Sequence, residues 1–534
     1  MGRTIVSIPA ELCMAMEIFN RKTKFYFLSF IKHDFKASIT VFFVALPLCL
    51  GISLASGVPV FSGLLAGIIG GLIVSILSGS QLSVSGPAAG LTAICAACIL
   101  QFGNISFLFL ATLVAGGLQV LLGLLKLGGF TRFIPSAVIK GMLAAIGIIL
   151  MSKQIPILIG YDQANFWTKE LFNIITLNHG IEHIENVFVH TSVGAIIITI
   201  FSFLVLIFWK KISGKKLSFI PTSFVIVFLA SLLAWVFNRF IPSLALSATQ
   251  YVHLPENLFS QIKLPNFNLL FQNFEIIKTG IIICFVATLE TLLSIEAIDK
   301  LDPNHRSTPQ NRELIAQGIG NMLGGLLGAL PITAVIVRSS ANKEAGAHTK
   351  LSSFFHGFWL LLVLLFLVSI LSYVPFAVLA VILVRTGFNL AKPKMIFSVY
   401  KLGREQFIPF IVTVGAILLT DLLIGVCIGI AYAAYFILKN TYKAGFTLEK
   451  RMDGHNMHYY FRMAINVSFI NKKKIKEELE KIPEYSIVEI DGSHSVYIDY
   501  DVLEILNEFK SKATQKHIEL ILKGIAEVEL VSIH

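Results

Sequence analysis

Two segments of the sequence place proline, glycine and hydroxyl residues inside runs that are otherwise apolar. The first, Gln81–Ala93, reads QLSVSGPAAGLTA, and the second, Gly328–Gly346, reads GALPITAVIVRSSANKEAG. Proline favours the first turn of a helix, where its missing N–H group would be unpaired in any case. We therefore expect extended backbone over Leu82–Gly86 and a helix that begins near Pro87 in the first segment.

The second segment has the same design and adds a cation. We expect extended backbone over Ile332–Val337, followed by a short helix that Arg338, Ser339 and Ser340 open. The start of a helix carries unpaired N–H groups and about half a positive charge, which attracts anions. The Arg338 guanidinium would add a full charge and a planar donor fork suited to oxyanions. The alternative interpretation is that Arg338 is a loop arginine near the surface.

A carboxylate lies in the middle of another apolar run. Glu290 is embedded in IIICFVATLETLLSI, and Ser294 follows one helical turn later on the same face. A charged side chain in a membrane span costs about 2.5–3.5 kcal/mol on insertion scales, so such a residue is a functional candidate. Glu290 could bind a co-transported cation, carry a proton or neutralise Arg338. The alternative is a hydrogen bond within a helix bundle.

The elements that must position these residues are membrane helices. Of the 534 residues 55% are hydrophobic and 14% are charged, whereas a soluble domain carries about 25% charged residues. A spanning helix needs about 20 apolar residues, which leaves room for a dozen or more spans. Fourteen apolar stretches lie near residues 37–56, 60–78, 87–102, 105–125, 134–152, 191–209, 222–238, 277–298, 313–330, 339–346, 355–372, 374–390, 407–420 and 422–438.

The two interrupted segments hold corresponding places in this series, because each is the third of seven stretches in its half of the chain. Paired interrupted segments of this kind mark the midplane substrate site of transporters.

Loop charges predict cytoplasmic termini, because lysine and arginine collect on the cytoplasmic side. The charges compared are Lys210, Lys211, Lys215, Lys216, Lys300, Arg306 and Arg312 in loops expected inside, and Asp162, Glu170, Glu182 and Glu185 against Lys153 and Lys169 in the loop expected outside.

The end of the chain has a different composition. Charged residues make up 27 of the 89 residues from Phe446 onward but 48 of the 445 before it. This break predicts a soluble α/β domain after the membrane domain. The expected elements are strands at 458–462, 465–469, 486–491 and 517–522, with helices at 472–482 and 500–510 that show helical spacing of apolar residues. We expect a cytoplasmic segment over 1–34, a membrane domain over 35–440 and a soluble domain over 445–534.

These motifs together resemble the SulP family of anion transporters. The resemblance rests on VALPLCLGISLASG (Val44–Gly57), QLSVSGPAAGLTA, the Glu290 span, NRELIAQGIGN (Asn311–Asn321) and LPITAVIVRSSAN (Leu330–Asn342). It implies an α-helical polytopic fold of about 14 spans in 7+7 inverted repeats, shared with uracil permeases and divided into core and gate. The tail, with DGSHSVYIDYD (Asp491–Asp501), resembles a STAS domain, a small α/β module that binds partners and regulates.

The resemblance also assigns the site. It implies an anion held by backbone N–H groups of both half-helices and by the matching arginine, which places the substrate at Pro87, Ala88, Ala89, Val337, Arg338 and Ser339. Sodium-coupled bicarbonate importers of the family resemble this chain at Glu290 and Ser294, so sodium or a proton is the expected coupling ion. They carry small or hydroxyl residues where this chain has Val335 and Ile336. Vertebrate relatives have serine at the place of Val337.

The expected function is secondary active transport of a small inorganic oxyanion, bicarbonate or sulfate. Rival interpretations are an anion channel and a nucleobase transporter on the same fold, although the latter holds an acidic residue where Arg338 stands. The sequence shows no phosphate-binding loop, metal cluster or catalytic triad, and the Cys95/Cys98 pair lies in an apolar run. We expect no enzyme, no cofactor, no metal and no nucleic-acid partner. We expect a multi-pass protein of the bacterial inner membrane, a homodimer among membrane lipids, with a cytoplasmic regulatory partner possible through the STAS domain.

Overall fold

The computed structural model describes residues 10–129, 134–161, 191–212, 220–253, 265–269, 273–420, 422–453 and 456–526. The chain forms two compact units. The first, here the membrane unit, comprises Met1–Ser398 and Thr413–Val426, and the second, here the tail unit, comprises Val399–Val412 and Cys427–His534. The acidic loop expected outside, from residue 162, and the lysine pair at 215–216 lie outside the described residues.

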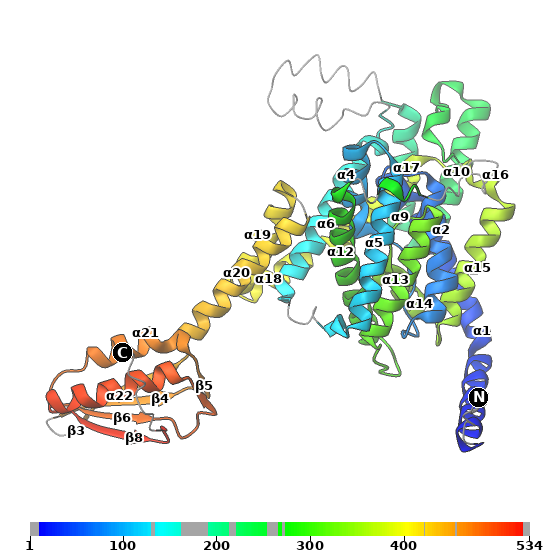
Figure 1. Ribbon diagram of the computed structural model, residues 1–534. Helices are drawn as coiled ribbons and strands as arrows, with labels where there is room; N and C mark the ends of the chain where they lie inside the picture. The colour runs from blue at the N-terminus through cyan, green and yellow to red at the C-terminus, as the bar shows by residue number, and fades with distance from the viewer. Residues whose placement is uncertain are drawn as a thin grey trace, which may run out of the picture. The chain divides into compact units, whose positions relative to one another are not determined.

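Helices make up most of the membrane unit (Figure 1). In chain order, and including those shared with the tail unit, they are α1 (Ala10–Ala55), α2 (Val60–Ile69), α3 (Ser75–Leu77), α4 (Thr92–Phe102), α5 (Ile105–Leu124), α6 (Ser136–Leu158), α9 (Val193–Ile212), α10 (Thr222–Phe240), α12 (Phe274–Asp299), α13 (Gln310–Leu327), α14 (Ile336–Glu344), α15 (Leu351–Phe366), α16 (Val368–Leu371), α17 (Phe376–Leu390), α18 (Pro393–Lys401), α19 (Arg404–Leu419) and α20 (Leu422–Lys443).

Eight helical segments in the described part of the chain are long and apolar enough to cross a membrane, and three shorter apolar helices accompany them. This confirms a polytopic helical membrane protein, while the count of fourteen spans stays a prediction. The expected tenth stretch at 339–346 is the nine-residue α14, which is too short to span a bilayer alone. The segment over 1–34 belongs partly to α1, which runs without interruption from Ala10 to Ala55.

Packing of α5 against α12 and α13 forms one side of the membrane unit (Figure 1). The approach of α5 to α13 depends on glycine, because a Cβ atom at Gly116 would lie 2.5 Å from the backbone nitrogen of Met322. This is the small-residue packing expected of membrane helices. On the other side α1 packs against α2 and α15.

The two interrupted segments form the only strands of the membrane unit that the described residues contain, β1 (Ser85–Pro87) and β2 (Ile332–Ala334). The helix after β1 begins later than expected: Pro87 ends the strand, and a 3-10 turn over Ala89–Leu91 precedes α4. The helix after β2 begins earlier, at Ile336. The strand pairing explains both shifts. It keeps the first segment extended through Pro87, and it ends at Ala334 in the second segment, so that α14 can begin soon afterwards.

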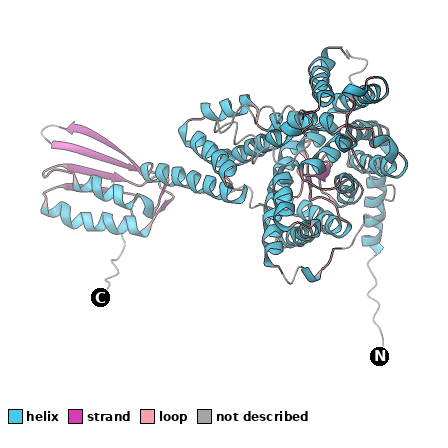
Figure 2. Ribbon diagram, turned by 90° about the horizontal axis from the view of Figure 1, so that it is seen from above, coloured by secondary structure: helices cyan, strands magenta, loops and turns pink. Residues whose placement is uncertain are grey.

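The tail unit is a small α/β domain (Figure 2). Its four-stranded sheet has the order β3 (Phe446–Asp453), β4 (Asn456–Met463), β6 (Ile487–Asp491) and β8 (Glu519–Lys523), with β3 antiparallel to β4 and the other pairs parallel. The short strands β5 (Asn466–Val467) and β7 (Tyr497–Ile498) pair separately. Helices α21 (Lys472–Glu480) and α22 (Tyr500–Gln515) cover one face of the sheet and share its apolar core.

These elements confirm the α/β fold predicted for the tail and add two strands, β3 and the short β7. The sequence analysis missed β3, which carries the exposed charges of Glu449, Lys450 and Arg451. Charged side chains are common on an edge strand, where they discourage pairing with another chain. The strand expected over 465–469 shrinks to Asn466–Val467, because a 3-10 turn begins at Phe469.

Candidate functional site

The two interrupted segments cross at one place in the membrane unit. Strands β1 and β2 pair antiparallel, with Gly86 opposite Thr333 and Pro87 opposite Ile332. Two more backbone hydrogen bonds extend the pairing of the two strands. One runs from the Ala88 N–H to the Pro331 carbonyl (3.3 Å), and the other runs from the Val335 N–H to the Val84 carbonyl (3.0 Å). Both strands are buried throughout. Two chain segments almost 250 residues apart thus meet, each leading into the start of a helix.

The six predicted anion ligands gather around this crossing. Pro87, Ala88 and Ala89 lie at the end of β1 and are buried. Val337, which is half-buried, and the buried Arg338 lie in the first turn of α14. The structure thus brings the two half-helix starts together, as the paired breaks predict.

Ser339, the sixth predicted ligand, is engaged by the protein itself. Its hydroxyl donates to the Val335 carbonyl (2.8 Å) and accepts from the Val84 N–H (2.9 Å). Its own N–H donates to the same carbonyl of Val335 (3.0 Å). Ser339 therefore fixes the start of α14 onto the segment before β1.

Arg338 is completely buried, so the surface-loop interpretation is wrong. None of its three guanidinium nitrogens makes a hydrogen bond to a described residue. A Cβ atom on Gly86 would lie 2.1 Å from one terminal nitrogen, so the guanidinium packs directly against the backbone of β1. The Cys49 thiol and the His356 ring lie beside it. Arg338 thus places an uncompensated charge behind the strand crossing.

Glu290 approaches the crossing from α12. A Cβ atom on Gly90 would lie 2.8 Å from one Glu290 carboxylate oxygen, and this oxygen is buried without a hydrogen-bond partner among the described residues. The carboxylate therefore lies against the first turn of the first half-helix. Ser294, one turn further along α12, is buried.

Thr291, which the sequence analysis did not single out, contacts the other strand. Its hydroxyl accepts a hydrogen bond from the Ala334 N–H (3.2 Å) at the end of β2. Helix α12 thus contacts both halves of the crossing through neighbouring residues, Glu290 on one side and Thr291 on the other. The available sequence signal was a hydroxyl residue directly after the buried carboxylate.

A ladder of three buried polar side chains on α13 supports the crossing, and the sequence analysis missed its role. The ladder consists of Glu313, Gln317 and Asn321, spaced four residues apart on one helix face. At its centre the Gln317 amide donates to the Ser85 hydroxyl of β1 (2.7 Å) and to the Glu313 carboxylate (3.0 Å). At its N-terminal end the Glu313 carboxylate accepts a hydrogen bond from the Ser78 hydroxyl (2.5 Å).

Asn321, at the C-terminal end of this ladder, makes two hydrogen bonds to β2. The Asn321 amide oxygen accepts from the Ile332 N–H (2.6 Å), and its nitrogen donates to the Ile332 carbonyl (3.0 Å). The same nitrogen donates to the Gln119 side chain of α5 (2.7 Å), which in turn reaches Thr288 of α12 (3.4 Å). Glutamate, glutamine and asparagine at this spacing inside a membrane helix were the signal available in the sequence.

A cavity of about 430 Å³ adjoins the first half-helix. Its lining comes from the start of α4 (Gly90, Thr92), from α6, from the first half of α12 (Lys278) and from the turn between α19 and α20 (Leu422). Gly90 therefore lines the cavity on one side and contacts Glu290 on the other. None of the six predicted anion ligands lines this cavity.

Comparison with known proteins decides the family. Residues 31–413 match the model of the sulfate permease family. The chain belongs to this family. YvdB of Bacillus subtilis, whose name proposes sulfate transport, is 28% identical over 95% of this chain and 94% of its own length. The bicarbonate transporter BicA of Picosynechococcus is 26% identical over 76% of this chain and 69% of its own length.

Solved structures confirm the fold. The murine solute carrier 26 family member A9, described as an anion transporter in the inward-facing state, superposes with a TM-score of 0.75 over 98% of this chain and 90% of that one, at 15% identity. The transmembrane domain of a cyanobacterial BicA gives a TM-score of 0.61 over 75% of this chain and 97% of that one, at 21% identity. The family consists of transporters, so this chain is a multi-pass inorganic anion transporter and not an enzyme.

Proposed function

We propose that the chain is a secondary active transporter of a small inorganic oxyanion, bicarbonate or sulfate, and works by alternating access. The anion would bind at the β1–β2 crossing, next to Pro87–Ala89 and Val337–Ser339 at the two half-helix starts. The backbone N–H groups of Ala89, Val337 and Arg338 would hold it, because Pro87 has no N–H and those of Ala88 and Ser339 donate to the Pro331 and Val335 carbonyls. The printed names of relatives include both sulfate and bicarbonate transporters, which supports this pair of substrates.

One observation carries this proposal: Arg338 is fully buried and has no hydrogen bond or ion pair within the described part of the chain. An uncompensated charge in a low-dielectric interior is strongly unfavourable. An anion bound at the adjacent helix starts would compensate it through space, with the helix dipoles adding to the attraction. A nucleobase transporter has no need for a buried cation at this position, so the site favours an anion.

The coupling role falls to α12. We propose that Glu290 binds sodium or carries a proton, with Ser294 on the same helix face as a further ligand. The contact between Glu290 and Gly90 supports coupling, because a cation or proton at the carboxylate would change the charge beside the first half-helix. Compared with a channel, such a device ties anion movement to that of a second ion.

The cavity beside Gly90 offers an access route. We take the termini to be cytoplasmic and the membrane to be the bacterial inner membrane, which places the start of α12 and the α19–α20 turn on the outer side. The cavity would then lead from outside to the first half-helix, between a core that contains α4 and α12 and a gate that contains α6.

The tail, over 445–534, would be a STAS domain that supports a homodimer or a cytoplasmic partner, after a membrane domain over 35–440.

Flux measurements test the proposal directly. The purified chain in proteoliposomes should take up labelled sulfate or bicarbonate with saturation, counter-transport and dependence on a sodium or proton gradient. Uptake that does not saturate and shows no counter-transport would indicate a channel. Uptake of uracil without uptake of either anion would refute the proposed substrate class.

A further inference from the structure

A small groove at the end of α10 has the composition of a lipid headgroup site. The groove measures about 180 Å³ and is lined by Trp235, Asn238, Arg239, Tyr251 and Tyr373. Three aromatic side chains thus surround one arginine and one amide. Tryptophan and tyrosine are enriched at membrane–water interfaces, where their rings bridge apolar and polar surroundings.

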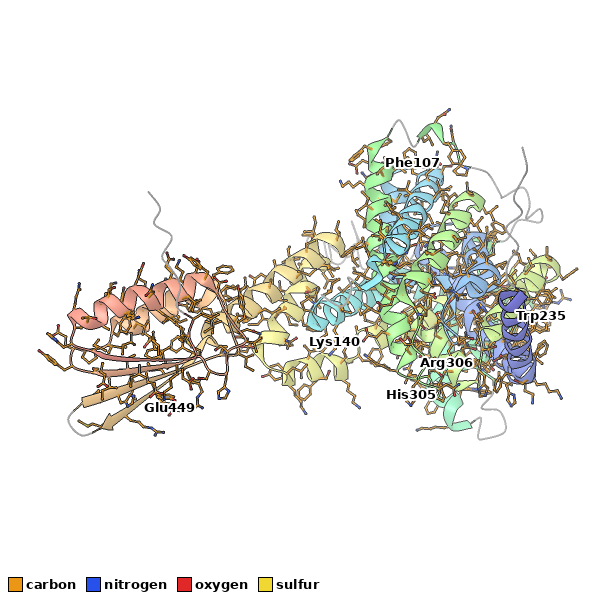
Figure 3. The ribbon with its side chains drawn as sticks, turned by 60° about the horizontal axis from the view of Figure 1, so that its bottom comes forward. Phe107, Lys140, Trp235, His305, Arg306 and Glu449 are labelled. Carbon is orange, nitrogen blue, oxygen red and sulfur yellow. The ribbon has the colours of Figure 1, made fainter. Side chains whose placement is uncertain are left out.

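Apolar side chains that face outward flank this groove on both sides. Only 28% of the residues in the apolar 18-residue stretch of α10 are buried within the protein, so most of this helix faces lipid. Figure 3 shows Trp235 at the edge of the membrane unit. Exposed apolar residues continue from the groove along α10 (Phe228, Leu232, Phe240) and along the end of α15 and α16 (Phe366, Leu367, Ile370). Acyl chains of a lipid seated in the groove would therefore lie against apolar surface.

The groove is held in shape by hydrogen bonds that do not involve its arginine. The Asn238 amide donates to the Tyr251 hydroxyl (2.8 Å) and accepts from the Leu246 N–H (3.2 Å). Tyr251 forms an isolated antiparallel bridge with Pro375, directly beyond the loop that carries Tyr373. These contacts fix the aromatic walls in the absence of a ligand.

Charge selects the ligand. Arg239 is exposed and forms no ion pair with a described residue, and the lining contains no carboxylate. The groove therefore presents one net positive charge at the end of a helix that faces lipid. We propose that it binds the phosphodiester of an anionic phospholipid, with Arg239 on the phosphate and the acyl chains along α10 and α16. A zwitterionic lipid would bring its own ammonium group next to Arg239 and bind less tightly.

Native mass spectrometry of the purified full-length protein tests this site. The protein is offered an equimolar mixture of phosphatidylglycerol and phosphatidylcholine in detergent, and the lipids it retains are counted. We expect preferential retention of phosphatidylglycerol, reduced about fivefold by Arg239→Gln, which corresponds to about 1 kcal/mol for one arginine at a membrane surface. Arg451→Gln is the matched control, because the side chain of this exposed arginine of the tail makes a single ion pair with the described residues, to the exposed Glu449 at 3.3 Å.

A second readout uses the aromatic wall. In a variant in which Trp235 is the single tryptophan, phosphatidylglycerol with brominated acyl chains should quench its fluorescence, and Arg239→Gln should weaken the quenching at low lipid. Equal retention of the two lipids, unchanged retention in Arg239→Gln, or displacement of the lipid by inorganic phosphate would each overturn the proposal. So would an Arg239→Gln variant that changes the monomer–dimer ratio but not the lipid count, since the groove would then bind a second copy.

Discussion

Replacement of Asn321 by leucine should disable the anion site without contacting the anion. Leucine has the same number of side-chain heavy atoms and the same branching as asparagine, but it is bulkier and cannot hydrogen-bond. It removes both bonds to Ile332 of β2 and the bond to Gln119 of α5. The Ile332 N–H, the Ile332 carbonyl and the Gln119 amide oxygen would then be buried without these partners.

The expected size of the effect follows from that count. Each buried group left unpaired costs about 1–3 kcal/mol, so three cost roughly 3–9 kcal/mol. A cost of this size favours displacement of β2, so that the freed groups find other partners, and we therefore expect a displaced β2 rather than an intact crossing. Displacement worth even about 1.4 kcal/mol at the site lowers anion affinity about tenfold. We therefore expect Asn321→Leu to lose at least that much affinity.

The assay is anion-dependent thermal stabilisation in detergent, together with initial rates of uptake in proteoliposomes. Asn311→Leu is the matched control, because it makes the same change on the same helix but removes one bond, from the Gly128 N–H at 2.8 Å. Gln119→Leu is an intermediate case, since it leaves the bonds between Asn321 and Ile332 in place. Full anion affinity in a correctly inserted Asn321→Leu protein would refute the idea that the α13 ladder positions the site.

Further predictions concern the site and the tail. Arg338→Ala should abolish or strongly impair uptake while expression remains, and Gly86→Ala should impair it too, because the new Cβ would lie 2.1 Å from the guanidinium; normal uptake by Arg338→Ala would remove the residue from the site. Glu290→Gln should change coupling more than anion binding, which a comparison of uptake with and without sodium and proton gradients measures; unchanged gradient dependence would make Glu290 structural. Truncation after Asn440 should leave anion-dependent thermal stabilisation intact with slower transport, and a folded truncation that binds no anion would place the tail in the site.

Local sequence was enough to locate the crossing but not its boundaries. Proline and glycine in two apolar runs at corresponding places showed where the helices break. The residue at which each helix begins depends on the partner strand, which lies almost 250 residues away, and no local pattern contains that information. The pairing of β1 with β2 keeps Pro87 extended and lets α14 begin at Ile336.

The direction in which a side chain points also could not be predicted from the sequence. Arg338 was expected beside the helix starts, and it lies there, but its guanidinium packs against Gly86 and the interior rather than lining the cavity near Gly90. The polar ladder on α13 shows the same limit. Its spacing is visible in the sequence, but which strand each side chain reaches depends on how α13 packs against α5 and on where β1 and β2 cross.

The antiparallel pairing of β1 with β2 also sets an order for biogenesis. The Val84 N–H depends on the Ser339 hydroxyl, which the ribosome adds 255 residues later. At about 5–20 residues per second, that delay is roughly 13–50 s. During this time the first interrupted segment has no strand partner, and backbone polar groups cannot stay unpaired in contact with lipid. Neighbouring helices of the first half or the insertion machinery must therefore cover this segment until the second half arrives, and neither half of the membrane unit should form the anion site when it is made alone.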